Sequence, residues 1–136
     1  MGMNNKHNKV GKNGENCVTA MLRNKGHKVE RAAYGSPFDL QVDGRIRVEV
    51  KTAMPSKFGA THTWAFNIHR HNRLKEDFVD VYILRLERVL GTRQAIHLLM
   101  KSPVKQKNII ISTKALISGA WYKELLAWKE FSENNC

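Results

Sequence analysis

The stretch that decides the fold runs from Phe38 to Thr52 and reads FDLQVDGRIRVEVKT. Apolar residues alternate with polar ones on both sides of an Asp-Gly pair, a pattern typical of two β-strands joined by a tight turn. If both apolar sets face one core, Val42 lies opposite Ile46 and Leu40 lies opposite Val48. This register leaves a three-residue loop with a glycine available for positive φ.

The same register brings three polar side chains together on the other face of the hairpin. Asp39 lies directly across from Glu49, and Lys51 follows on the same strand and the same face. Directly opposed residues have Cβ atoms about 5 Å apart, and two carboxylates that close repel each other unless a cation lies between them. Hard oxygen ligands favour Mg²⁺ or Mn²⁺. The pattern therefore predicts a divalent-metal site.

Such a metal polarises a phosphate and lowers the pKa of a bound water. Lys51 would orient the attacking water or stabilise charge that develops on the phosphate, and the backbone carbonyl of Val50 would be a further ligand. A helix is predicted over residues 14–25, with its core face marked by Val18 and Leu22. Because Glu15 lies on that face, we expect it to join the metal site directly or through water.

The remaining sequence predicts a mixed run of strands and a final helix. Residues 1–13 are polar and basic, and we expect them to form a mobile basic arm over a ligand. Residues 52–62 are predicted as a loop, and an apolar stripe marks a helix at 117–131. Further strands are expected at about 27–33, 64–68, 79–86, 94–100 and 108–112. This order indicates one α/β (α+β) domain over residues 1–136, with a central sheet flanked by helices.

The charge of the chain points to a polyanionic partner. Lys and Arg number 23 against 12 Asp and Glu, a formal net charge of +11. Segments 51–75 and 88–123 contain no acid at all, which suits phosphates that release counterions when neutralised. The residues that we expect to contact DNA from these features are Lys9, Lys12, Lys57, Arg70 and Arg73.

The cysteines and the hydropathy of the chain bear on the expected cellular location of the protein. The two cysteines, Cys17 and Cys136, favour neither a disulfide framework nor a cysteine zinc site, so a reducing cytoplasmic location is expected. No apolar run reaches the roughly 18 residues of a membrane span.

With these residues in place, the run from Gly14 to Thr52 resembles the PD-(D/E)xK nuclease superfamily. In that family the first-helix glutamate, the aspartate of the second strand and the E-x-K of the third strand form the active site. The resemblance implies these roles for Glu15, Asp39, Glu49 and Lys51. It also implies a restriction-endonuclease-like core with a central mixed sheet.

Within the superfamily, the early pattern is most similar to archaeal-type Holliday-junction resolvases. These carry an arginine and a serine before the aspartate, which implies that Arg31 contacts DNA and that Ser36 lies near the metal. The leading hypothesis is therefore a Mg²⁺-dependent endonuclease that acts as a homodimer on four-way DNA junctions. Two features depart from the pattern: Phe38 separates Pro37 from the aspartate, and residues 52–68 predict a loop and a strand in place of a helix.

Three alternatives stay open. The departure after the E-x-K motif leaves room for a homing-type or restriction-type nuclease of the same superfamily. The His-Arg-His-Asn run at 69–72 invites a ββα-metal nuclease, although no second well-spaced cluster supports it. A non-catalytic nucleic-acid-binding module would use the basic surface while the acids form a structural ion pair.

Overall fold

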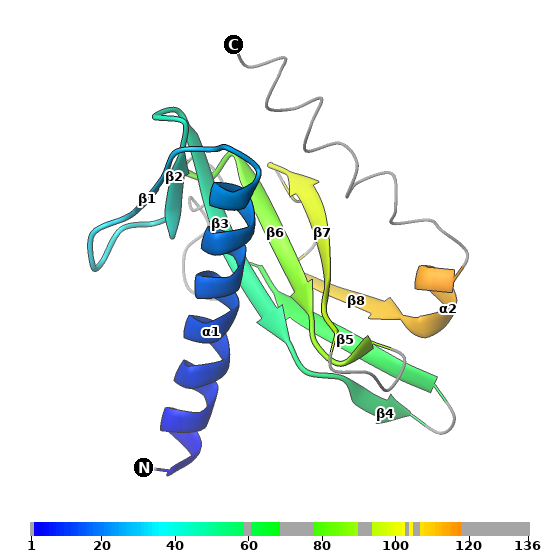
Figure 1. Cartoon of the computed structure of the whole chain (residues 1–136). Coiled ribbons are helices and arrows are strands. Elements are labelled where there is room, and N and C mark those ends of the chain that lie inside the picture. The colour runs from blue at the N-terminus through cyan, green and yellow to red at the C-terminus, as the bar shows by residue number, and fades with distance from the viewer. Residues whose placement is uncertain are drawn as a thin grey trace.

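The computed structural model describes residues 2–58, 61–68, 78–89, 94–102, 104 and 107–117. A long helix, α1 (Gly2–Asn24), crosses one face of a five-stranded sheet, and a second, three-stranded sheet packs against part of the opposite face (Figure 1). In spatial order, the five-stranded sheet contains β1 (Val29–Arg31), β2 (Leu40–Val42), β3 (Ile46–Ala53), β6 (Val81–Leu86) and β7 (Ile96–Lys101). The predicted mixed α+β class with a central sheet is confirmed.

The β2–β3 hairpin has the register that the apolar alternation predicts. Leu40 pairs with Val48, and Val42 pairs with Ile46. Asp43 in the turn has a φ of 55°, a left-handed conformation that Asp tolerates better than most residues. Its carboxylate accepts hydrogen bonds from His27 at 2.8 Å and from the backbone N–H of Lys28 at 3.0 Å. The turn is therefore tied to the segment that leaves α1.

β3 pairs with a different strand on each side, and the two pairings cover different parts of its length. On one side β3 runs parallel to β6 from Val48 to Ala53. The start of this parallel pair is fixed by Asp80, whose carboxylate accepts hydrogen bonds from the backbone N–H and the guanidinium of Arg47. On the other side, β2 reaches only as far as the pairing of Leu40 with Val48. The second half of β3 therefore presents an edge that β2 does not cover.

The helix α1 packs on the sheet through a tight contact at Gly14. Val18 and Leu22 of α1 are buried against Val48 and Ile83 of the sheet. A Cβ atom placed on Gly14 would collide with the side-chain oxygen of Thr52 and would lie 3.2 Å from the Cβ of Thr52. Only glycine lets the helix backbone come this close to β3.

Two expectations about α1 and the following segments need correction. The predicted helix start at Gly14 is wrong, because α1 begins at Gly2 and includes most of the segment expected to form an arm. The expected loop at 52–62 is also partly wrong: β3 continues to Ala53, and residues 56–58 form strand β4. The expected helix at 117–131 lies outside the described residues, except for its first position.

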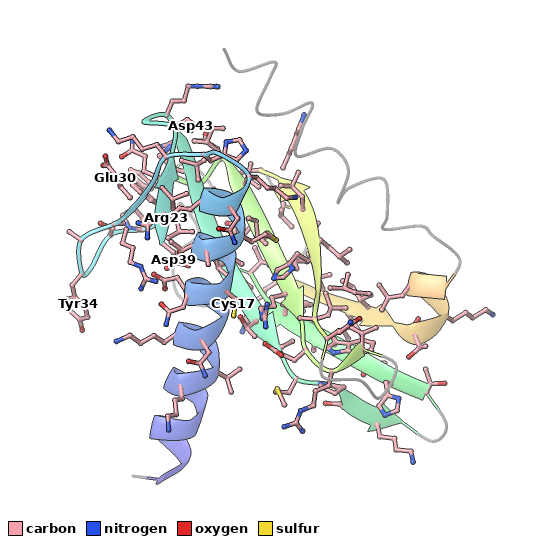
Figure 2. All side chains as sticks on the ribbon, viewed as in Figure 1. Cys17, Arg23, Glu30, Tyr34, Asp39 and Asp43 are labelled. Atoms are coloured by element: carbon pink, nitrogen blue, oxygen red, sulfur yellow. The ribbon has the colours of Figure 1, made fainter. Side chains whose placement is uncertain are left out.

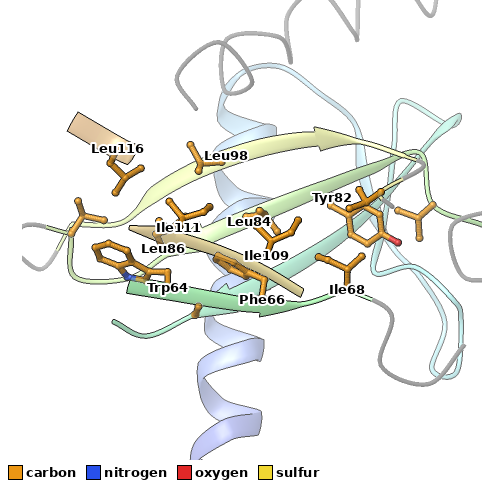
Figure 3. Close-up of a cluster of buried hydrophobic side chains, with 14 residues drawn as sticks. Trp64, Phe66, Ile68, Tyr82, Leu84, Leu86, Leu98, Ile109, Ile111 and Leu116 are labelled. Carbon is orange, nitrogen blue, oxygen red and sulfur yellow. The ribbon is translucent and has the colours of Figure 1, made fainter. Parts of the chain in front are cut away.

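The second sheet consists of β4 (Ser56–Phe58), β5 (Thr61–Asn67) and β8 (Asn108–Ser112), all antiparallel. A short helix, α2 (Thr113–Ile117), follows β8. Alternate side chains of β5 and β8 are buried with those of β6 and β7 in a shared core (Figure 3). Its largest fully buried members are Trp64 and Tyr82. This core covers the sheet face opposite α1. Among the described helices, none is long and apolar enough to cross a membrane.

Gly14→Ala should destabilise the protein, because its methyl group enters the contact with Thr52. Overpacking of this kind costs about 1–3 kcal/mol, and the loss would appear in the free energy of unfolding measured by urea denaturation. Gly11→Ala is the matched control, since nothing lies within 4 Å of a Cβ at Gly11. A helical Gly→Ala change without a clash stabilises by up to about 1 kcal/mol. Equal effects of the two substitutions would contradict the close approach of α1.

Candidate functional site

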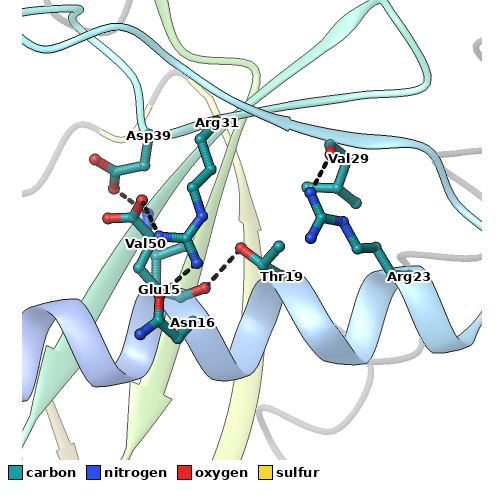
Figure 4. Close-up of polar contacts among 8 residues, drawn as sticks. All are labelled: Glu15, Asn16, Thr19, Arg23, Val29, Arg31, Asp39 and Val50. Atoms are coloured by element: carbon teal, nitrogen blue, oxygen red, sulfur yellow. Dashed lines mark hydrogen bonds and ion pairs between the residues drawn. The ribbon is translucent and has the colours of Figure 1, made fainter.

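The candidate site lies where β2 ends and β3 continues. The backbone N–H of Asp39 donates to the carbonyl of Val48 at 2.9 Å, which extends the pairing one step past β2. The Asp39 carboxylate then accepts a hydrogen bond from the backbone N–H of Val50 at 2.8 Å (Figure 4). That N–H belongs to the uncovered edge of β3, so the carboxylate takes the place of a missing strand.

The backbone carbonyl of Val50 is placed by the same geometry. In a β-strand the N–H and C=O of one residue point to the same edge. Because the Val50 N–H points to Asp39, its carbonyl also faces the uncovered edge beside that carboxylate. The predicted backbone ligand and the predicted acidic ligand therefore share one edge of β3.

Glu49 and Lys51 lie on the sheet face opposite α1. Glu49 is only 5% exposed, and burial of an ionised carboxylate is unfavourable unless a cation or hydrogen bonds offset it. The ammonium group of Lys51 lies 3.9 Å from Glu49 Oε2. The lysine thus supplies positive charge at the buried acid, as the sequence register predicts.

Glu15 reaches the same region from α1. Its side chain points toward Asp39 (Figure 4), and its carboxylate lies 3.9 Å from the guanidinium of Arg31. Burial raises the pKa of Glu15, and repulsion from Asp39 raises it further, while Arg31 and Lys12 lower it by a smaller amount. The structure therefore brings Glu15 and Asp39 close enough for their charges to interact.

The acids are neighbours but do not form a closed ligand set. Within the part of the chain that the structure describes, no three His, Cys, Asp or Glu side chains converge closely enough to hold a metal ion. Asp39 is turned to the Val50 N–H, and Glu49 is close to Lys51. The metal-ligand roles of Asp39, Glu49, Val50 and Glu15 stay predictions.

The other predicted site residues are distributed more widely. Ser36 is exposed in the loop between β1 and β2, whose tip carries the fully exposed Tyr34 (Figure 2). Among the described residues, no hydrogen bond or ion pair joins Ser36 to Asp39 or Glu49. Its catalytic role therefore stays a prediction.

Apart from Arg31, which lies beside Glu15, the predicted DNA contacts fall into three groups. Lys9 and Lys12 are exposed on α1, and the positive charge of Lys12 acts to lower the pKa of Glu15. Lys57 is exposed on β4. The remaining two, Arg70 and Arg73, lie outside the described residues, as does the His-Arg-His-Asn run at 69–72.

Asn16 belongs to the site but was not predicted from the sequence. Its side-chain oxygen accepts a hydrogen bond from the guanidinium of Arg31, and this contact holds the arginine beside Glu15 (Figure 4). Asn16 directly follows Glu15, but a polar residue on an exposed helix face is ordinary. The sequence therefore gives no signal that this asparagine meets β1.

A second polar cluster lies under α1 at the other end of β6. Arg85 donates to Glu87 at 2.6 Å, and its guanidinium lies 2.9 Å from His97 Nε2. Burial lowers the pKa of His97 to about 4, and the charge of Arg85 contributes to the shift. The histidine is therefore neutral at physiological pH and accepts the hydrogen bond. These contacts neutralise and fix Arg85 near Gly14.

Comparison with known proteins shows the fold. No protein-family model and no curated protein matches the chain. Among solved structures, the bacterial homing endonuclease I-Ssp6803I is similar, with a TM-score of 0.59 and 15% sequence identity. The match covers 76% of this chain and 76% of that one. This chain therefore has the fold of a structurally characterised endonuclease.

Glu15→Gln should alter how stability depends on pH. Because the folded-state pKa of Glu15 is raised, the folded protein holds this proton more tightly than the unfolded chain. The stability of the parent therefore falls as pH rises above 4.5, the ordinary pKa of Glu15, and the variant lacks this loss. In urea unfolding between pH 4 and 8, the free energy of unfolding of the variant should therefore rise relative to that of the parent as pH increases. Glu30→Gln, at an exposed acid on β1, is the control. A difference in free energy of unfolding between Glu15→Gln and the parent that stays constant with pH would contradict the charge effect.

Proposed function

We propose that this protein is a divalent-metal-dependent DNA endonuclease that hydrolyses phosphodiester bonds. The observation that carries the proposal is the edge of β3, where the Asp39 carboxylate and the Val50 backbone meet, with Glu49 and Lys51 on the same strand. Glu15 adds a third acid across this edge. The likeness in fold to a homing endonuclease supports the same reading.

The donor set suits Mg²⁺ or Mn²⁺. The repulsion between Glu15 and Asp39 is the situation that a divalent cation relieves, and carboxylate and carbonyl oxygens are the ligands that such ions prefer. Asp39, Glu49 and the Val50 carbonyl would hold the ion, with Glu15 joining directly or through water. When bound, the ion would polarise the scissile phosphate and lower the pKa of an attacking water.

The protein side chains have separate tasks in the proposed reaction. Lys51 stands beside Glu49 with a fixed positive charge, and it would orient the water or stabilise the negative charge on the phosphate. Glu15, with its raised pKa, is a stronger base than an ordinary glutamate and would accept a proton from the water. Arg31, held by Asn16, would contact a neighbouring phosphate.

Two DNA substrates are consistent with this chemistry. The sequence resemblance favours four-way junctions, cut by a homodimer in which each subunit cleaves one strand. The likeness to a homing endonuclease favours cleavage of linear duplex at a specific site. The net charge of +11 suits either DNA form.

Cleavage assays with Mg²⁺ test the proposal. Glu49→Gln and Lys51→Met should each lower the cleavage rate by about 100-fold or more, a size typical of lost charge stabilisation at a reaction centre. DNA binding, measured by fluorescence anisotropy in Ca²⁺, should be largely retained. The matched controls are Glu30→Gln on β1 and Lys28→Met directly before it, where both side chains are exposed.

The same assay separates the substrates when junction, linear duplex and single-stranded DNA are compared. Paired symmetric nicks confined to the junction would support the resolvase, and cleavage at one site in a long duplex would support the site-specific nuclease. DNA binding without metal-dependent cleavage by the parent would instead favour a non-catalytic DNA-binding module. Undiminished cleavage by Glu49→Gln would refute the proposed active site.

Metal binding can be measured without cleavage. Titration of Mn²⁺ should raise the Tm of the parent, because a ligand that binds only the folded state at 100 times its Kd adds about 2.7 kcal/mol. Asp39→Asn should abolish most of this shift. The amide keeps an oxygen for the Val50 N–H but loses the charge, so the strand edge stays paired. An unchanged Mn²⁺ response in Asp39→Asn would place the metal elsewhere.

A further inference from the structure

The outward face of the β5–β8 pair has a composition unlike the rest of the chain. Along β5, Trp64 and Phe66 are buried, whereas Ala65 and Asn67 between and beyond them are exposed. Along β8, Ile109 and Ile111 are buried on the same side as Trp64. The alternate residues therefore form an outer face, which we call the ribbon face.

The strand register arranges the ribbon face into matched rows. Three cross-strand pairs face outward: Asn67 with Asn108, Ala65 with Ile110, and Thr63 with Ser112. The rows thus offer two amides, two apolar groups and two hydroxyls in turn. The two Asn residues are exposed, and among the described residues neither side-chain amide is engaged by another group.

The ribbon face is neutral in a chain of net charge +11. None of its six described residues is charged, although two exposed lysines flank β8, Lys107 directly before it and Lys114 in α2 after it. Ile110 is 67% exposed at its centre. A neutral strip with hydrogen-bonding and methyl groups, bordered by cations, matches the chemistry of a DNA groove between two phosphate backbones.

We propose that the ribbon face enters the major groove of duplex DNA and reads base edges. This inference rests on the proposed function, because it takes DNA as the partner, and it adds sequence selection to it. The Asn amides would pair with adenine, the hydroxyls would bond either base of a pair, and Ala65 and Ile110 would contact thymine methyls. The flanking lysines would contact phosphates.

The dimensions of the ribbon agree with this assignment. The major groove admits a two-stranded β-ribbon, and the Asn67–Asn108 end is two strands wide because β4 pairs only with residues 61–63 of β5. Outward residues on a strand repeat every ~6.8 Å, which is about two base steps of duplex DNA. Three rows would therefore span roughly five base pairs.

The Asn67–Asn108 end is also the end that leads toward the candidate active site. Ile68, which follows β5, is buried in the same core as Tyr82 (Figure 3). Tyr82 is the register partner of Glu49 across β3 and β6. A duplex read by the ribbon face would thus run past the strand that carries Glu49 and Lys51.

Selection from a pool of 20-base-pair duplexes with randomised centres tests the proposal. The full chain would be used in Ca²⁺, which occupies hard oxygen sites without supporting rapid cleavage, and bound duplexes would be sequenced. The parent should enrich a motif. Asn67→Ala and Asn108→Ala should each relax the preference at their base pairs by about tenfold, the usual size of a bidentate base contact. Affinity for a duplex lacking the motif and its salt dependence should stay unchanged. Asn24→Ala, at the exposed end of α1, is the matched control and should enrich the parent motif.

Three outcomes would overturn the assignment. The first is that the parent binds all duplexes equally, and the second is that the Asn67 and Asn108 variants enrich the parent motif unchanged. The third would make the ribbon face a contact between two copies of the chain: Ile110→Lys would convert a dimer to a monomer in analytical ultracentrifugation, with base preference intact. None of these results decides whether the protein cleaves DNA, since loss of base preference does not abolish phosphodiester hydrolysis in the Mg²⁺ assay. Failure of cleavage with intact base preference would refute the proposed function alone.

Discussion

The hydrogen bond from the Val50 N–H to the Asp39 carboxylate is the contact on which the candidate site depends. It exists because β2, which begins at Leu40, covers β3 only as far as Val48, while β3 continues to Ala53. An uncovered strand edge carries backbone groups that need partners. Here a carboxylate satisfies the N–H and leaves the Val50 carbonyl facing the same edge. The interruption of one strand thus places the acid beside the Val50 backbone.

Contacts on both faces of the sheet fix the side chains around this part of β3. Gly14 lets α1 approach Thr52, which brings Glu15 over the edge of β3. On the far face, Glu49 is buried beside its register partner Tyr82, and the ammonium group of Lys51 lies 3.9 Å from its carboxylate. The consequence is a glutamate whose pKa is raised first by burial and then by repulsion from Asp39. Such an environment is unfavourable for an ionised carboxylate, and an arrangement of this kind is typical of sites that bind cations or perform catalysis.

In the proposed enzyme, one sheet carries the catalytic groups and the other carries the groups that read the bases. The five-stranded sheet carries the acids and Lys51, whereas β5 and β8 of the second sheet present neutral side chains outward. A separation between charged catalytic groups and neutral reading groups suits DNA, because phosphates carry the charge and base edges carry the sequence. The proposed base reading agrees better with cleavage of a duplex site than with cleavage of junctions chosen by shape.

The sequence by itself determined the β2–β3 register, because apolar alternation over a short hairpin is a local signal with one solution. It also placed Glu15 on the inward face of α1. The sequence did not predict the true start of α1, because a polar, basic segment with few apolar residues has no helical periodicity. Strand β4 was not predicted either, because Pro55 and Gly59 mark a loop while the pairing of β4 with β5 is tertiary. Only the tertiary structure decided that β2 ends beside Val50, that Asn16 holds Arg31, and that β5 and β8 share an outward face. Each of these depends on contacts between segments far apart in the chain, which no local pattern encodes.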